Sequence, residues 1–138
     1  MQNIKAKDFM DPAPLAIEPD TGVIRALRKL LSAKVSGAPV VDQEQHLVGF
    51  ISEADCMRGT LMGSYYTSVG ELVRDRMTTE VESIGPEANI VDIAETFLKN
   101  HRSILPVVKE GKVIGLIERH ALLEQLMEHI DHNENLVA

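Results

Sequence analysis

The sequence predicts an α+β fold made of two copies of one β-α-β-β-α unit. The first observation is an internal repeat, because residues of the first half return 67 positions later in the second half. The matching positions include Asp8 and Asp75, Met10 and Met77, and the runs 39–41 and 106–108. The second observation is size, since a copy of about 55–60 residues buries too little surface to be comfortably stable alone. We therefore expect the two copies to pack sheet to sheet with pseudo-two-fold symmetry, leaving two equivalent clefts.

Each copy begins with a short predicted strand and an amphipathic helix. Leu15 to Ile17 form the strand, which Pro19 and Asp20 end. Apolar residues then recur at helical spacing in both copies: Val23, Leu27, Leu30 and Leu31 in the first, and Ile90, Ala94, Phe97 and Leu98 in the second. Asn89 is placed to cap the second of these helices, and Asp92 lies in its first turn, where negative charge suits the helix dipole.

A predicted β-hairpin follows the helix. Residues 38–41 and 47–51 are short apolar runs, and the polar turn 42–46 lies between them. In the second copy the turn 109–112 is one residue shorter and contains Gly111, so that the repeat offset changes there to 66. Each hairpin leads into a second helix, from about Glu53 to Met62 and from about Arg119 to Ile130.

These elements give the expected domain organisation. The first repeat covers residues 1–62, a connector rich in Gly, Ser and Tyr covers 63–70, the second repeat covers 71–130, and 131–138 form a C-terminal tail.

Composition excludes several classes of protein. The formal net charge of −7 argues against a nucleic-acid partner. The single cysteine, Cys56, rules out an internal disulfide and is expected to fill space in the core. The chain has no apolar segment of the length that a membrane helix needs and no signal-peptide pattern, so we expect a cytoplasmic protein without a membrane partner. Because the P-loop, the zinc-hydrolase H-E-x-x-H spacing and the G-x-S-x-G elbow are all absent from the sequence, we expect neither catalysis nor a bound metal.

Several segments carry a resemblance to a known family. They are the Met-Asp-Pro at residues 10–12, the VSGAPVVD segment at 35–42, the LVGFISEAD segment at 47–55, and the echoes RMT, ILPVV and VIGLIE in the second half. Their order and double occurrence resemble a stand-alone tandem pair of cystathionine beta-synthase (CBS) domains, a Bateman-type regulatory module. The resemblance implies a sensor, without catalytic activity and with no required cofactor, that binds AMP, ADP, ATP or S-adenosylmethionine in a cleft between the repeats.

The resemblance also suggests the ligand-binding residues. In the family, a serine or threonine ending the last strand and an aspartate three residues later face the nucleotide, and Ser52 and Asp55 match this pattern. Ionised aspartate can accept hydrogen bonds from both ribose hydroxyls, and serine can donate to a phosphate. The remaining expected contacts surround the base: Ala16, Ile17, Ser36, Gly37, Ala38 and Pro39. Ser52 and Asp55 also fit a capping box at the start of a helix, and the two roles are compatible.

The second repeat departs from the nucleotide-binding pattern. Glu118 and Ala121 stand where the first repeat has Ser52 and Asp55, so we expect at most one nucleotide per chain. Basic residues that precede the strand proline in some relatives are also missing here, which favours a ligand of low negative charge. An alternative function is a ligand-free interaction module, in which the apolar stripe from Leu122 to Ile130 mediates homodimerisation or docking on a regulated protein that the sequence does not identify.

Overall fold

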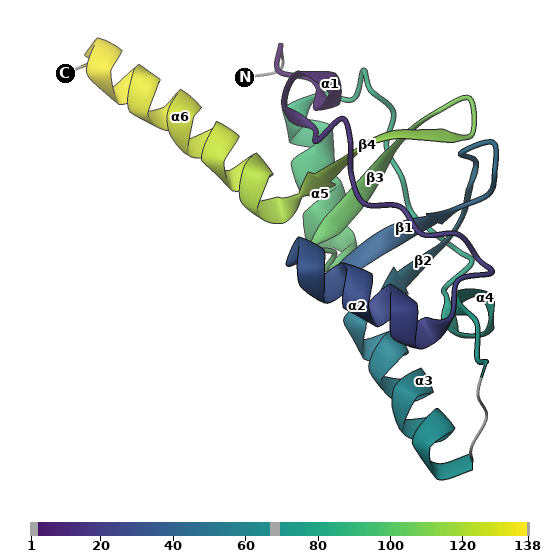
Figure 1. Ribbon diagram of the computed structural model, residues 1–138. Helices are drawn as coiled ribbons and strands as arrows, with labels where there is room; N and C mark the ends of the chain where they lie inside the picture. Colours follow the sequence, from purple (N-terminus) through teal and green to yellow (C-terminus); the bar gives the residue numbers. More distant parts are fainter. Residues whose placement is uncertain (1–2, 67–69, 138) are drawn as a thin grey trace. The chain divides into compact units, whose positions relative to one another are not determined.

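The chain folds into two compact units, each built around one copy of the repeat. The computed structural model describes residues 3–66 and 70–137 (Figure 1). We call Pro14–Val81 with Gly111–Val113 the central unit. Met1–Ala13, Glu82–Glu110 and Ile114–Ala138 form the terminal unit. The predicted α+β class and the two repeats are confirmed, since helices and one antiparallel hairpin recur in each unit.

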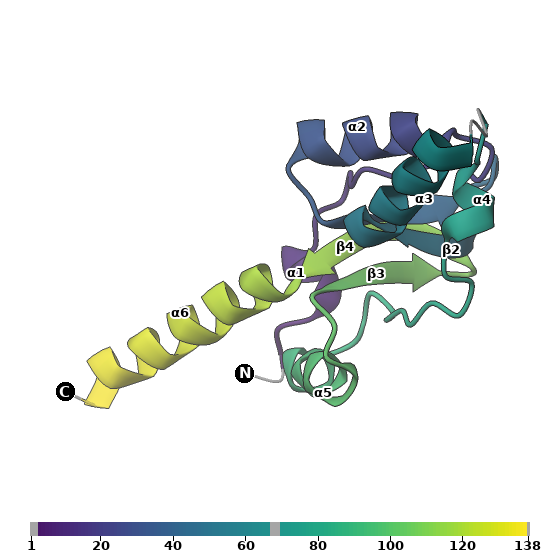
Figure 2. The same cartoon turned by 90° about the horizontal axis from the view of Figure 1, so that it is seen from below.

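The central unit packs two helices on one face of a β-hairpin. Its elements are α2 (Val23–Ala33), β1 (Gly37–Val41), β2 (Leu47–Ser52), α3 (Glu53–Tyr66) and the short α4 (Val73–Arg76). Figure 2 shows α2 and α3 on the same side of β1 and β2. The core between them is aliphatic and contains Ile17, Leu30, Val40, Ile51 and Val73, all fully buried. Cys56 is also fully buried in this core, as a space-filling residue would be.

The terminal unit contains the same kinds of elements, but its short helix comes first in the chain rather than last. It contains α1 (Ala6–Phe9), α5 (Ile90–Asn100), β3 (Ile104–Lys109), β4 (Lys112–Glu118) and α6 (Arg119–Val137). Its core contains Ala6, Ile90, Ile93, Leu105 and Ile117. The predicted cap of α5 is confirmed, because the Asn89 side chain accepts a hydrogen bond from Asp92 N at 2.9 Å. The residues that end α2 and α5, Lys34 and His101, both adopt left-handed backbone angles, so the two helices end in the same way.

The structure corrects the predicted first strand of each repeat. Ile17 makes an isolated parallel bridge with Val40, and Ile84 makes the same bridge with Val107. Ile17 N donates to Pro39 O at 3.0 Å, and Val41 N donates to Ile17 O at 2.9 Å. Of the predicted strand Leu15 to Ile17, only Ile17 pairs with the edge of β1. A longer ladder does not form because Pro19 and the turn at Asp20 follow directly.

The two hairpin turns differ as the repeat offset predicted. In the longer turn, Asp42 Oδ1 accepts hydrogen bonds from Glu44 N and His46 N, both at 2.9 Å. These bonds hold the pKa of the Asp42 carboxyl below its usual value. In the shorter turn, Glu110 and Gly111 have φ values of 53° and 81°. Positive φ at both central residues is typical of a two-residue hairpin loop, which explains the deleted position.

The short helices α1 (Ala6–Phe9) and α4 (Val73–Arg76) were not predicted from the repeat, and neither packs on the copy that follows it in the chain. Each lies immediately N-terminal to one copy but packs on the other, so that α1 joins the terminal unit and α4 the central unit. Ala6 N donates to Ala88 O at 2.9 Å, and 67 positions later Val73 N donates to Thr21 O at 2.8 Å. The repeated Asp8 and Asp75 cap the first turn of these helices. Each carboxylate accepts a hydrogen bond from the backbone N–H three residues earlier.

The second helix of each repeat is longer than the sequence predicted. α3 continues to Tyr66, through half of the predicted connector 63–70, whose residues 67–69 lie outside the described part of the chain. α6 continues to Val137, so most of the predicted tail 131–138 is helical. The division of the sequence into repeats at 1–62 and 71–130 stays a prediction. Across the described residues, no helix combines the length and the apolar character that crossing a membrane requires.

Candidate ligand sites at the two strand-to-helix junctions

The junction of β2 and α3 holds Ser52 and Asp55 in a reciprocal capping box. Asp55 N donates to Ser52 Oγ at 3.1 Å, and Ser52 N donates to Asp55 Oδ2 at 3.0 Å. These bonds satisfy two backbone N–H groups that the first turn of α3 would otherwise leave unpaired. The structural role expected for this pair is therefore present, and it fixes the Asp55 carboxylate at the N-terminus of a 14-residue helix, where anions are also favoured.

The β1 side of the same site is mostly backbone. Gly37 pairs with Ser52 across the hairpin, so the end of β1 lies directly beside the capping box. Ile17, Gly37, Ala38 and Pro39 are buried in the core. Ser36 is exposed, and its carbonyl accepts a hydrogen bond from Glu53 N at 2.8 Å. Strand pairing and hydrogen bonds therefore link three of the eight predicted residues, Gly37, Ser52 and Asp55, and a separate hydrogen bond links Ile17 to Pro39. Ile17 and Pro39 are buried, and Ile17 N, Ile17 O and Pro39 O already take part in the pairing of Ile17 with β1.

A guanidinium group lies beside the Asp55 carboxylate. Arg58 Nη2 donates to Asp55 Oδ1 at 2.7 Å, and the Arg58 side chain is 63% exposed while that of Asp55 is 14% exposed. An arginine with an exposed fork keeps several N–H donors for another acceptor. The adjacent Cys56 thiol is buried, and this burial, together with the Asp55 charge, raises its pKa. A raised pKa and full burial leave this cysteine without the properties of a reactive thiol.

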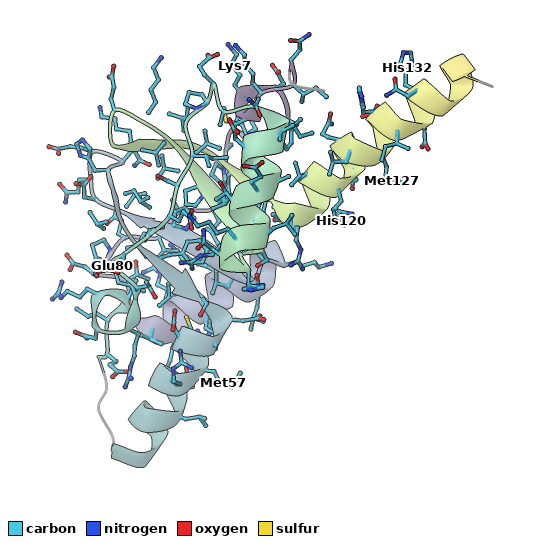
Figure 3. The ribbon with its side chains drawn as sticks, turned by 180° about the vertical axis from the view of Figure 1, so that it is seen from behind. Lys7, Met57, Glu80, His120, Met127 and His132 are labelled. Atoms are coloured by element: carbon cyan, nitrogen blue, oxygen red, sulfur yellow. The ribbon has the colours of Figure 1, made fainter. Side chains whose placement is uncertain are left out.

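The equivalent junction of the terminal unit forms a pocket of different chemistry. A cavity of about 230 Å³ lies where β4 ends and α6 begins. Its charged and polar lining is Asp11, Glu118, His120 and Glu124, and its apolar lining is Phe9, Met10, Leu116 and Ala121. Figure 3 shows His120 near the start of α6, with Met127 and His132 further along the same helix. Glu118 and Ala121 were expected to weaken nucleotide binding here, but Asp11 and Glu124 gave no sequence signal, because their proximity depends on how residues 9–11 pair with β4.

One further group of potential metal ligands lies in the β1–β2 turn. Oxygen or nitrogen atoms of Asp42, Glu44 and His46 lie within 4.8 Å of one another. His46 Nδ1 is 3.4 Å from Asp42 Oδ2 and 3.5 Å from Glu44 Oε2. Asp42 also accepts two backbone hydrogen bonds within this turn. The shape of the turn therefore accounts for the cluster without a bound metal.

The chain belongs to the CBS domain family, as the fold and the two junctions indicate. The family model matches twice, at residues 6–60 and 69–128, which confirms the tandem pair. Both matches begin at or before the short helices α1 and α4, so the exchanged segments belong to the family pattern.

Known proteins with this architecture include both small and large chains. The crystal structure of CBSX2 in complex with AMP is 31% identical, has a TM-score of 0.80, and is covered over 97% of its chain and 91% of this one. CBSX2 is a protein of Arabidopsis thaliana. This chain is also 29% identical to the uncharacterised protein MJ1225 of Methanocaldococcus jannaschii, over 83% of this chain and 40% of that protein. It is 36% identical to inosine-5'-monophosphate dehydrogenase of Aquifex aeolicus, over 82% of this chain and 22% of the dehydrogenase. The chain therefore spans less than half of either curated relative.

Proposed function

We propose that this protein is a regulatory module that binds an adenosine-containing ligand at Ser52 and Asp55 and signals to a partner protein, without catalysing a reaction. The observation that carries the proposal is the Asp55 carboxylate, held by Ser52 N and adjacent to the exposed Arg58 guanidinium. A carboxylate has about four lone-pair positions, so two existing bonds leave capacity for ribose hydroxyls. The similarity to CBSX2, whose structure contains AMP, supports AMP as the first ligand to test.

The pair of charges at this junction suits both ends of a nucleotide. Asp55 is the acceptor for the ribose, and Arg58 is one helical turn further on, where it can turn its free N–H donors towards a phosphate. A ligand regulates only when it binds one arrangement of the protein more tightly than another. In this proposal the ligand binds beside the first turn of α3, and its affinity differs between the two arrangements of the protein.

The test measures the thermal shift caused by AMP in variants of the capping box. Asp55→Ala removes both the proposed ribose acceptor and a helix cap, so we expect a lower melting temperature without AMP and loss of the AMP-induced increase. Asn89→Ala is the matched control, because it removes the cap of α5 outside the proposed site. Each cap loss should cost about 1 kcal/mol, but only Asp55→Ala should abolish the response to AMP. An unchanged AMP response in Asp55→Ala would refute the site.

A second proposed function is self-association, for which the exposed apolar side chains provide the reason. α6 carries Leu123, Met127 and Ile130 at helical spacing, with exposures of 50%, 54% and 41%. They lie beside Leu122 and Leu126, which pack on the core of the terminal unit. Exposed apolar residues that follow one face of a helix are typical of an interface, and we propose a second copy of the chain as the partner.

Sedimentation velocity tests this second proposal. We expect a homodimer at micromolar concentration and a shift to monomer in the Leu123→Glu, Met127→Glu double variant. Glu128→Lys, an exposed change on the same helix, serves as the control for altered charge. A wild-type monomer at these concentrations would contradict the dimer and leave the AMP test unaffected.

A further inference from the structure

The pocket at the end of β4 has an acidic side with unused acceptor capacity. Asp11 Oδ1 accepts from Ala13 N at 3.0 Å, which leaves its second oxygen available. Glu124 Oε1 lies 2.8 Å from His120 Nε2, so one of its oxygens is occupied. Within the described part of the chain, the Glu118 side chain takes part in no hydrogen bond or ion pair, and the pocket lining contains no Lys or Arg. Three carboxylates in one concave site attract positive charge.

The other side of the pocket is apolar. Leu116 of β4 is only 7% exposed and lines the pocket. Met10 packs closely against Gly115, where an added Cβ would lie 2.9 Å from Met10 Cγ. Phe9 adds an aromatic ring, and aromatic faces attract ammonium groups. A bare metal ion would make no use of this apolar lining, whereas an organic cation would contact both sides.

The size of the pocket limits the ligand. Its volume of about 230 Å³ lies below the roughly 300–1,000 Å³ of sites that hold drug-sized ligands. A small molecule, or the end of a longer one, is the appropriate occupant. A primary ammonium group offers three hydrogen-bond donors, which matches the three carboxylates.

The equivalent positions of the central unit carry a different set of charges. Asp11 corresponds to Thr78, Glu118 to Ser52 and Glu124 to Arg58, by the same repeat offsets of 67 and 66. The backbone is alike at both places, since Asp11 bridges Leu116 in one unit and Thr78 bridges Phe50 in the other. Ala121, which also lines the pocket, corresponds to Asp55, so the pocket has three acidic side chains where the central unit has one acidic side chain and one arginine.

From this geometry we infer that the pocket at the end of β4 binds a small organic cation, namely a primary ammonium compound with an apolar carbon chain. The ammonium group faces Asp11, Glu118 and Glu124, and the carbon chain lies against Leu116 and Met10. The chain then carries two ligand sites of different net charge, and this inference does not depend on the adenosine proposal.

The experiment uses amide NMR of the full chain with four probes. These are n-butylamine, 1,4-diaminobutane, the neutral 1-butanol and Mg²⁺. We expect at least one amine to shift the signals of residues 9–11 and 116–124, with 1-butanol causing no comparable change. Glu118→Gln with Glu124→Gln should weaken amine binding at least about tenfold, the effect of one lost charged contact. Glu128→Gln is the control, since this exposed residue lies on the same helix outside the pocket.

Three results would overturn the inference. They are equal binding of 1-butanol and the amines, amine affinity that the double variant does not change, and no binding by either amine at a dissociation constant of about 1 mM or tighter. Binding by Mg²⁺ with no response to the amines would show a metal site instead and would also overturn it. The AMP response of the double variant should stay as in the wild type, which separates this site from Ser52 and Asp55.

Discussion

Glu87 is an exposed residue whose ionisation is coupled to the fold. Its carboxylate accepts hydrogen bonds from Lys5 Nζ and Lys7 Nζ, both at 2.8 Å. These two hydrogen bonds lower its pKa from 4.5 to about 2. Lys5 and Lys7 belong to the N-terminal segment, so this carboxylate helps to hold α1 in the terminal unit.

The lowered pKa of Glu87 predicts an acid-dependent loss of stability. A carboxyl group with a lower pKa in the folded than in the unfolded state stabilises the fold above its unfolded pKa. This contribution should be complete above about pH 4.5 and should disappear as the pH falls towards 2. We therefore expect Glu87→Gln to lower the melting temperature near neutral pH and to have little effect at about pH 2. Equal destabilisation at both pH values would show that the charge of Glu87 is not responsible.

The capping box of Ser52 and Asp55 could be predicted from the sequence, whereas the ion pair of Asp55 with Arg58 could not. Ser52 and Asp55 were predicted to form a capping box because three-residue spacing before a helix is a local pattern. The ion pair of Asp55 with Arg58 was not predicted, since it depends on the side-chain rotamers that α3 selects. The acidic pocket was missed for a related reason, as Asp11 and Glu124 are far apart in sequence and meet only through backbone pairing at Leu116.

Among the elements, the second strand of each hairpin carries a glycine that accommodates a methionine. Met77 lies on Gly49 of β2, and Met10 lies on Gly115 of β4. A Cβ at either glycine would be 3.0 Å from the carbonyl oxygen of Thr78 or Asp11, respectively, and closer still to the methionine sulfur. These glycines allow the short segments after α4 and α1 to pair with the edges of the hairpins.

Replacing one of these glycines should separate the segment from the strand. We expect Gly115→Ala to destabilise the protein by about 1–3 kcal/mol, the usual cost of overpacking a tight contact. Gly85→Ala is the matched control in the same unit, because an added Cβ there meets nothing within 4 Å. Urea denaturation measures both variants, and equal midpoints for them would contradict the packing role of Gly115.

Most elements could be predicted because their signals are local and occur twice. The periodicity of Val23 to Leu31 and the deleted position near Gly111 located α2 and the second hairpin turn correctly. The ends of α3 and α6 were placed too early, since the polar residues after Met62 and Ile130 lack a helix-breaking proline. The short helices were missed because four residues give no readable period.

At the scale of the whole molecule, the terminal unit depends on a segment that is distant in the chain. The helix α1 precedes the central unit but packs in the terminal unit, whereas α4 lies within the continuous stretch of the central unit. Ala6 and Val73 are fully buried equivalents in α1 and α4, one in the core of each unit. The internal repeat could predict two similar units but could not tell which unit receives each helix. Either assignment satisfies the same apolar pattern, and only the length and path of the connections decide between them.

Matched hydroxyl substitutions should reveal this exchange. Burying a hydroxyl without a full set of partners costs about 1–3 kcal/mol. We expect Ala6→Ser to increase amide hydrogen exchange mainly at residues 84–117, and Val73→Thr to increase it mainly at residues 17–51. Mass spectrometry of peptides from both regions provides the measurement. If each substitution instead affected the nearest repeat in sequence, residues 17–51 for Ala6→Ser, the assignment of the helices to their units would be wrong.

The packing of α1 in the terminal unit also affects how the nascent chain folds during translation. As the ribosome releases the chain, residues 14–81 emerge as one continuous stretch and contain nearly everything that the central unit needs. Residues 3–13 leave the exit tunnel before them, yet their binding surface on α5 and β4 does not exist until the last third of the chain has been translated. The helix α1 is therefore synthesised before the surface on which it packs, and its buried residue Ala6 becomes covered only after that later part of the chain has been made.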